Sequence, residues 1–282
     1  MIRWILASLM LLLISGCKKD EQAIVPSFVS IPEVGVEVSA NQGTSRHGIS
    51  EVWVYADSSL LGAFAVGATF PVIASEAFTL DLFAGIRENG QALAPRTYPF
   101  LNPVQVNLLP KIGETQTLRP SFTYHPRTTF KLNEDFERSQ IFDEDLDQDE
   151  ATFLFIREDG IEGRSASAVL TPEHPTLEVA SNQILRDIPT TGQSTYLEME
   201  YRSDVPLQVG LRGHGPGIGP AKNYKLVLFP TDIATKIYVN FSPDLQASQL
   251  LGYQVIFLAT FEVDFGILEQ RIDLDNIKLL HF

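Results

Sequence analysis

The 282-residue sequence has few of the residues on which several protein classes depend. Its single cysteine excludes a disulfide-stapled scaffold. It has 21 Lys and Arg against 35 Asp and Glu, a formal charge of −14, and therefore lacks the basic excess that nucleic-acid binding requires. None of its five histidines has a cysteine partner or the spacing His-x-x-x-His, so the sequence indicates no zinc site. Disorder is also excluded, because 44% of the residues are hydrophobic, and the length suggests roughly two domains.

An apolar run near the start of the chain has the length of a signal peptide. Met1-Ile2-Arg3 supplies a positive charge, and the run from Trp4 to Ile14 follows it. About 20 apolar residues are needed to span a bilayer, so this run is too short for a membrane helix. It matches the hydrophobic region of a secretory signal, and we expect residues 1–16 to be removed.

The end of this run carries a first resemblance. Leu13-Ile14-Ser15-Gly16-Cys17 resembles the lipobox of bacterial lipoproteins, an aliphatic residue and two small residues before a cysteine. The resemblance implies that Cys17 becomes the first residue and carries a diacylglycerol and a further acyl chain such as palmitate. Several acyl chains anchor a protein stably to a membrane. An ordinary secretory signal with an unrelated cysteine is the alternative.

The residues after the cysteine suggest where the protein is displayed. Lys18-Lys19-Asp20-Glu21 is similar to the surface-export signal of outer-membrane lipoproteins from Bacteroidota. That similarity implies a lipidated tether over residues 17–25 and display on the extracellular side of the outer membrane. A plain charged tether is the alternative.

Beyond the tether, strand patterns dominate. Polar and apolar residues alternate in Glu33 to Val38 and in Ile49 to Tyr55, as in half-buried strands, and the strand signals recur about every ten residues. Pro120 and Pro126 interrupt the pattern. We therefore predict an all-β chain with two β-sandwich domains, an immunoglobulin-like sandwich over residues 26–120 and a jelly roll over residues 121–282.

Two further resemblances bear on these domains. The segments Val52 to Asp57, Leu61 to Phe64 and Thr69 to Val72 resemble PEGA-type immunoglobulin-like repeats, which implies a spacer without chemistry. Asp135-Phe136-Glu137 and Leu274 to Leu279 resemble the opening and closing strands of carbohydrate-binding-module jelly rolls. That resemblance implies that the first and last strands pair and that their acidic residues hold a structural calcium ion.

Calcium is the one metal that the residues suggest. Asp135 and Glu137 are two residues apart and would share one face of a strand, where Asp275 would meet them from the paired terminal strand. The alternative is solvent-facing acids beside a turn. The acidic run Asp143 to Glu150 is not an EF-hand, because Gln148 stands at the turn glycine and Leu154 at the bidentate glutamate.

One carboxylate pair permits a catalytic hypothesis. Glu198 and Glu200 would face one side of a strand about 6.6 Å apart, a spacing that glycosidases use. Arg202 continues that face, so simple charge balance is the alternative. The sequence has no G-x-S-x-G motif, and Cys17 is reserved for lipid, so nucleophilic catalysis has no candidate.

The glycine- and proline-rich stretch Gly213 to Pro220 does not open a helix, so it is not a phosphate-binding loop. We predict a mobile loop at the sandwich rim, with Arg212 and His214 as ligand-binding candidates. The expected function is a lipid-anchored, surface-exposed, non-catalytic binding protein that recognises an extracellular glycan or docks onto a partner protein. The alternatives are an accessory subunit of an outer-membrane transport or secretion complex and, last, a glycoside hydrolase. No cofactor is required for this function; the covalent lipid on Cys17 and the candidate structural calcium ion are the two bound groups that the sequence suggests.

Overall fold

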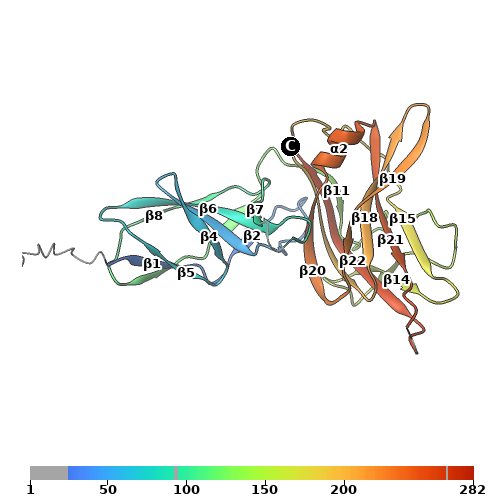
Figure 1. The fold of residues 1–282 in the computed structure, drawn as a ribbon, viewed down its shortest axis with the longest axis horizontal. Helices are drawn as coiled ribbons and strands as arrows, with labels where there is room; N and C mark the ends of the chain where they lie inside the picture. Colours follow the sequence, from blue (N-terminus) through green and yellow to red (C-terminus); the bar gives the residue numbers. More distant parts are fainter. Residues whose placement is uncertain (1–24, 92–94, 265) are drawn as a thin grey trace, which may run out of the picture.

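A computed structural model describes residues 25–91, 95–264 and 266–282 of the chain. The expected signal peptide, the lipidation site Cys17 and the export signal Lys18, Lys19, Asp20 and Glu21 lie outside these residues. The strands form two β-sandwiches that follow one another along the long axis of the molecule (Figure 1). No helix in the described part of the chain has the length and apolarity to cross a bilayer. The prediction of an all-β chain with two sandwiches is confirmed.

The first sandwich is built from ten strands. They are β1 (Ser27–Ser30), β2 (Gly35–Glu37), β3 (Glu51–Ala56), β4 (Ser59–Ala65), β5 (Thr69–Val72), β6 (Phe78–Arg87), β7 (Pro95–Thr97), β8 (Val104–Leu108), β9 (Thr115–Thr117) and β10 (Ser121–Thr123). One sheet has the order β4-β3-β6-β7, with β8 also paired to β6. Facing it are the short sheets β5-β1-β9 and β10-β2. Because β10 pairs with β2, the strand pairing of this sandwich extends past residue 120.

The second sandwich holds the remaining strands and one helix. They are β11 (Thr129–Glu134), β12 (Glu144–Asp145), β13 (Phe155–Arg157), β14 (Ser165–Leu170), β15 (Thr176–Ala180), β16 (Leu185–Arg186), β17 (Thr195–Ser203), β18 (Leu207–Gly215), β19 (Ile218–Leu228), β20 (Thr231–Asn240), α2 (Ser242–Ser248), β21 (Gly252–Thr260) and β22 (Gln270–His281). One sheet has the order β13-β14-β22-β17-β20, and the other has the order β12-β15-β21-β18-β19.

Alternation along the strands builds the cores. In β3, Val52 and Val54 point inward and are buried, whereas Trp53 between them is partly exposed. In β21, Val255 and Phe257 enter the core of the second sandwich. Period-two patterning therefore places one face of each sheet in a hydrophobic core, as expected for half-buried strands.

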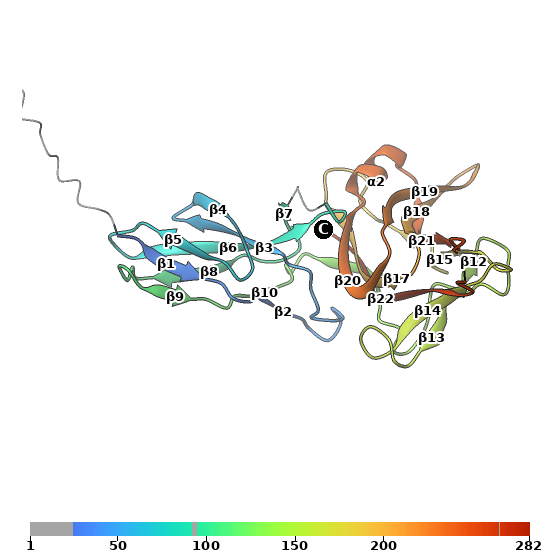
Figure 2. The ribbon, with the colours of Figure 1, turned by 60° about the horizontal axis from the view of Figure 1, so that its bottom comes forward.

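The first and last strands of the second sandwich pair, as the jelly-roll resemblance implies. Strand β11 runs antiparallel to β22, and β17 lies on the other side of β22. The outer face of this sheet turns toward the first sandwich, with β20, β22 and β17 nearest to it (Figure 2). The other sheet lies on the far side of the core from this junction.

Candidate functional site

An apolar cluster joins the two sandwiches. Tyr98 and Phe100 of the first sandwich pack against Tyr196, Tyr238 and Leu280 of the second. The ring centroids of Tyr98 and Tyr238 lie 4.9 Å apart in an edge-to-face arrangement. Aromatic pairs of this geometry add stability beyond their buried area, so the junction is a packed interface and not a loose linker.

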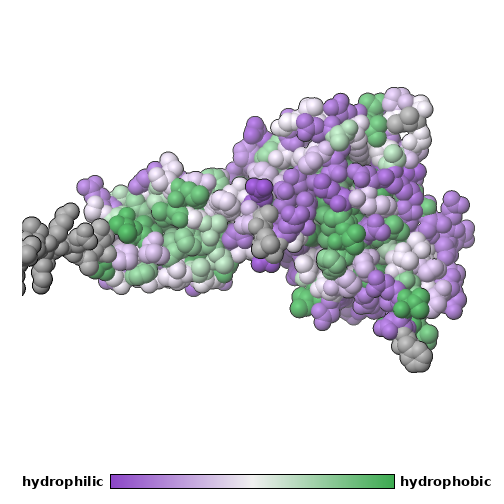
Figure 3. Space-filling view, viewed as in Figure 1, coloured by the Kyte–Doolittle hydropathy of each residue, from purple (hydrophilic) through white to green (hydrophobic). Residues whose placement is uncertain are grey.

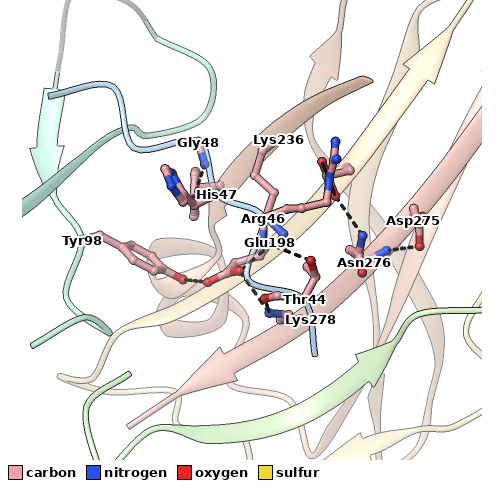
Figure 4. A network of polar contacts seen from close by, with 12 residues as sticks. Thr44, Arg46, His47, Gly48, Tyr98, Glu198, Lys236, Asp275, Asn276 and Lys278 are labelled. Atoms are coloured by element: carbon pink, nitrogen blue, oxygen red, sulfur yellow. Dashed lines mark hydrogen bonds and ion pairs between the residues drawn. The ribbon is translucent and has the colours of Figure 1, made fainter. Parts of the chain in front are cut away.

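Glu198 lies buried within this junction. Its carboxylate accepts a hydrogen bond from the hydroxyl of Tyr98, at 2.6 Å (Figure 4). It also accepts from the hydroxyl of Tyr124, at 2.9 and 3.0 Å. Burial alone would raise its pKa, but the ammonium groups of Lys236 and Lys278, 3.6 and 4.0 Å away, and the two hydroxyls hold the pKa below its ordinary value. Glu198 is therefore a buried anion with partners from both sandwiches.

Glu200 has a separate set of partners. Its carboxylate accepts Nε–H of Arg46, at 2.8 and 3.0 Å, and Nδ2–H of Asn276, at 2.8 Å. Arg46 belongs to the loop between β2 and β3, so this ion pair also spans the junction. A register shift in the β17–β22 pairing sets Glu198 opposite Lys278 and Glu200 opposite Asp275.

These contacts bear on the glycosidase hypothesis. The two carboxylates lie on one side of β17, as predicted, but the first sandwich covers that side. Each carboxylate is 2% exposed. A retaining or inverting glycosidase needs both groups free to flank a sugar, whereas here both are occupied by charged or hydroxyl partners. Glu198 and Glu200 instead bind the two sandwiches together through Tyr98, Tyr124 and Arg46, and we call these contacts the interdomain lock.

A groove of about 900 Å³ opens beside the lock. Its lining includes Arg46 and His47 from the first sandwich and Val227 and Phe229 from the end of β19 and the turn after it. Lys236 of β20 also lines the groove, and Glu200 is the one carboxylate among its lining residues. Burial lowers the pKa of His47, which favours its neutral form.

Arg212 and His214 lie elsewhere, on the outer face of the second sheet. Arg212 Nη1 donates to Glu144 and, at 3.2 Å, to Oε1 of Gln254. His214 Nε2 lies 2.6 Å from the same Oε1. Gln254 Nε2 donates to Glu144. The structure therefore joins the two predicted ligand residues in one polar network, which includes a glutamate and a glutamine that sequence reasoning did not select.

A second bridge crosses the same face. Tyr224 and Lys222 of β19 both donate to Glu178 of β15, the lysine at 2.6 Å. Two strands, β18 and β21, lie between β19 and β15, so a flat sheet would separate the two backbones by about 14 Å. The contact therefore requires the sheet to curl toward these side chains. Ile256, on the floor of the face, is fully buried beneath them. We call this surface the curled face.

The glycine-rich stretch differs from the prediction of a rim loop. Strand β18 continues to Gly215 and β19 begins at Ile218, so the stretch forms a β-hairpin with a two-residue turn. Gly217 has a φ of 73°, the left-handed conformation that such a turn favours and glycine adopts freely. Because of this hairpin, Arg212 and His214 are strand residues with fixed directions.

The residues predicted to bind calcium are only partly brought together. Asp135 and Glu137 follow β11 instead of sharing a strand face, because Phe136 between them has a φ of 55°. Both line a cavity of about 300 Å³ with Glu162 and Asn276. Asp275 lies buried beside it and accepts backbone N–H groups of Glu162 and Asn276, at 2.9 and 2.7 Å. Among the described residues, no group of three or more His, Cys, Asp or Glu is placed to hold a metal ion.

Comparison with known proteins gives only distant structural likenesses. No protein-family model matches the chain, and no curated protein sequence matches it. A family 11 carbohydrate-binding module from Clostridium thermocellum, in complex with a β-1,3-1,4-mixed-linked tetrasaccharide, is 13% identical with a TM-score of 0.38, covering 52% of this chain and 92% of the module. A module from a study of promiscuous specificity in the β-sandwich superfamily is 12% identical with a TM-score of 0.38, covering 90% and 96%. The enzymatically active domain of tailspike protein 4 of bacteriophage CBA120 is 10% identical with a TM-score of 0.41, covering 60% and 26%. At these values the fold of this chain rests on its own strand pairing.

Proposed function

We propose that the protein is a lipid-anchored, non-catalytic glycan-binding protein of the outer membrane. The curled face carries this proposal. It presents planar hydrogen-bonding groups, the guanidinium of Arg212 and the carboxylates of Glu144 and Glu178, while the buried amide of Gln254 holds Arg212 and Glu144 from beneath. Such groups pair with the adjacent hydroxyls of a sugar, which both donate and accept.

The chemistry of this face favours binding over catalysis. Each of its two glutamates is paired with a cation, Glu144 with Arg212 and Glu178 with Lys222. Burial tends to raise the pKa of Glu144, but the hydrogen bonds from Gln254 and Arg212 bring it below the ordinary value. A carboxylic acid held in its ionised form is a poor proton donor to a glycosidic oxygen, so recognition is the role that this surface supports.

A glycan array with the full-length protein tests the binding role. The Arg212→Gln variant is expected to lose at least tenfold in affinity for the glycans that the wild-type protein retains. Arg119→Gln is the matched control, because it removes an exposed cation from the first sandwich. Equal binding by the wild type and Arg212→Gln would contradict the proposal. Co-purification with an outer-membrane protein, with no glycan retained, would favour the accessory-subunit alternative.

The anchor is tested separately. Cys17→Ser is expected to abolish incorporation of labelled palmitate and to release the protein from the membrane fraction. Protease treatment of intact cells should degrade the wild-type protein if the Lys18 to Glu21 signal sends it to the surface. Full protection in intact cells, with degradation after lysis, would contradict surface display but would leave the lipid anchor unaffected.

A further inference from the structure

The groove at the junction of the sandwiches has a charge opposite to that of the chain. Three cations line it, Arg46, Arg87 and Lys236, against the single carboxylate of Glu200. That carboxylate already accepts hydrogen bonds from Arg46 and Asn276. Lys236 is in turn paired with Glu198 beneath the groove, so Arg87 supplies the uncompensated positive charge of this lining in a protein of formal charge −14. A concave site lined by one sign of charge attracts ligands of the other sign.

Two of these cations have unused hydrogen-bonding capacity. Arg46 donates only its Nε–H to Glu200, and its Nη groups make no hydrogen bond among the described residues, with 42% of the side chain exposed. Arg87 lies at the exposed rim and makes no ion pair within the described part of the chain. Both guanidinium groups can therefore donate to an anionic ligand, whereas the amine of Lys236 is buried against Glu198 and adds positive potential from beneath.

The lining also has an apolar part. Phe229 is 79% exposed in the turn between β19 and β20, and its backbone carbonyl accepts a hydrogen bond from the hydroxyl of Tyr201, at 3.1 Å. Val227, two residues before it, is half exposed. The groove thus combines an exposed aromatic ring with cations. The apolar face of a pyranose ring packs on such a surface while its polar substituents reach the cations.

We infer that this groove binds an acidic sugar residue of a glycan. Its carboxylate or sulfate accepts hydrogen bonds from Arg46 and Arg87, and its ring packs against Phe229. The acidic character follows from the cations of the groove, whereas the identity of the ligand as a glycan rests on the proposed function. The site shares no residue with the curled face, although the end of β19 borders the groove.

The test compares acidic and neutral forms of one glycan. The full-length protein is applied to an array that carries uronate oligosaccharides, their uncharged methyl esters and sulfated oligosaccharides. The wild type is expected to retain an acidic form at least tenfold more tightly than its uncharged counterpart, and raised salt should weaken that binding. The uronate and sulfate arms distinguish the two anionic groups.

Variants then locate the site. Arg87→Gln and Phe229→Ala, both at exposed residues of the groove, are each expected to lower affinity for the acidic glycan at least tenfold, whereas Arg119→Gln leaves it unchanged. Thermal melting verifies that the variants are folded. Equal binding of acidic and esterified forms, or full affinity in Arg87→Gln, overturns the inference. If Arg212→Gln alone abolishes binding, the inference fails and the proposed function stands. If the wild type retains no glycan at all, both fail.

Discussion

Glu198 and Glu200 show how much the surroundings of a carboxylate decide its role. Both belong to β17, both are buried, and they are two residues apart. Glu198 is held by two tyrosine hydroxyls and two lysines, whereas Glu200 is held by an arginine and an asparagine. A buried ion pair stabilises little by itself, but removal of one partner leaves the other charge without compensation.

The hydroxyl of Tyr124 provides a direct test of this lock. Tyr124→Phe removes a hydrogen bond to the buried carboxylate and is expected to lower the free energy of unfolding by about 1–3 kcal/mol. Tyr55→Phe is the matched control, because the hydroxyl of Tyr55 makes no hydrogen bond within the described residues. Denaturant unfolding of both variants measures the difference. An equal effect of the two substitutions would show that the bond contributes nothing.

Asp275 predicts a dependence of stability on pH. Burial, with smaller contributions from the carboxylates of Glu200 and Glu162, raises its pKa to about 7, although two backbone N–H groups oppose the shift. Below about pH 4 the folded and unfolded chains both hold the proton. Between about pH 4 and pH 7 only the folded chain holds it, so stability falls as the pH rises through this range.

Asp275→Asn removes this titration. The wild type is expected to lose about 1–2 kcal/mol of unfolding free energy between pH 5 and pH 8, less than the full shift implies because polar neighbours solvate the group. The variant should show a flatter profile over the same range. Denaturant unfolding in EDTA, at pH 5 and at pH 8, measures the unfolding free energy of both proteins without a bound cation. Parallel profiles for the two proteins would contradict the assignment.

The predicted calcium site is tested in the wild type by comparing the melting temperature in EDTA with that in added calcium. A higher melting temperature with calcium is expected, and no shift would contradict the site.

At the scale of elements, the sequence predicted what depends on local pattern. Alternation identified the strands around Val52 and Val54, and the closing segment from Leu274 to Leu279 was correctly expected to pair with the opening strand. The helix α2 has seven residues, too few for a helical period to be visible, and only the Ser242-Pro243 start marked it. The hairpin at Gly217 was missed because glycine and proline signal a turn without giving the length of the strands around it.

The junction site could not be predicted, because its contacts are distant in sequence. Arg46 and Glu200 are 154 residues apart, and Tyr98 and Glu198 are 100 apart. A lone arginine in a loop or a tyrosine in a strand carries no local signal of such a partner. Lys236 follows an ordinary strand alternation, so nothing in its neighbours marks it as a groove residue. Glu198 and Glu200 did give a sign of the junction in the sequence, because two charged residues inside a strand with apolar neighbours require partners.

Strand β18 needs a glycine at position 210 for the curled face to form. A Cβ at Gly210 would lie 2.3 Å from the backbone oxygen of Asn223 and 2.8 Å from the Cα of Tyr224. Gly210→Ala is therefore expected to lower the free energy of unfolding by about 1–3 kcal/mol and to weaken glycan binding, because the strand that carries Tyr224 must shift. Gly219→Ala, in the same hairpin, meets no atom within 4 Å and serves as the control. Equal stability of the two variants would contradict the close packing.

At the scale of the whole molecule, the junction fixes the two sandwiches relative to each other, and the free end of the first sandwich becomes the other notable surface. Among the described residues of this sandwich, the large exposed hydrophobic ones gather at the end that Val25 enters: Val25, Leu60, Leu61, Ile73, Leu109 and Ile112. Figure 3 shows hydrophobic residues at this end, away from the second sandwich. Val25 is eight residues after Cys17, and eight extended residues reach at most about 28 Å. A lipid on Cys17 would therefore keep this end close to the bilayer surface, where exposed aliphatic side chains are stabilised.

Fluorescent labels at this end test that orientation. Because Cys17 is the one native cysteine and its sulfur is expected to carry lipid, Ile73→Cys and Ile112→Cys can each be labelled with an environment-sensitive dye. In vesicles that hold the lipidated protein, both labels should show blue-shifted emission and quenching by spin-labelled lipid. Glu173→Cys, exposed on the second sandwich, is the control and should remain water-like. If the protein floats with the vesicles but all three labels report water, the end does not contact the bilayer. If Ile73 and Ile112 are shielded from iodide yet insensitive to the lipid quencher, a protein partner covers this end.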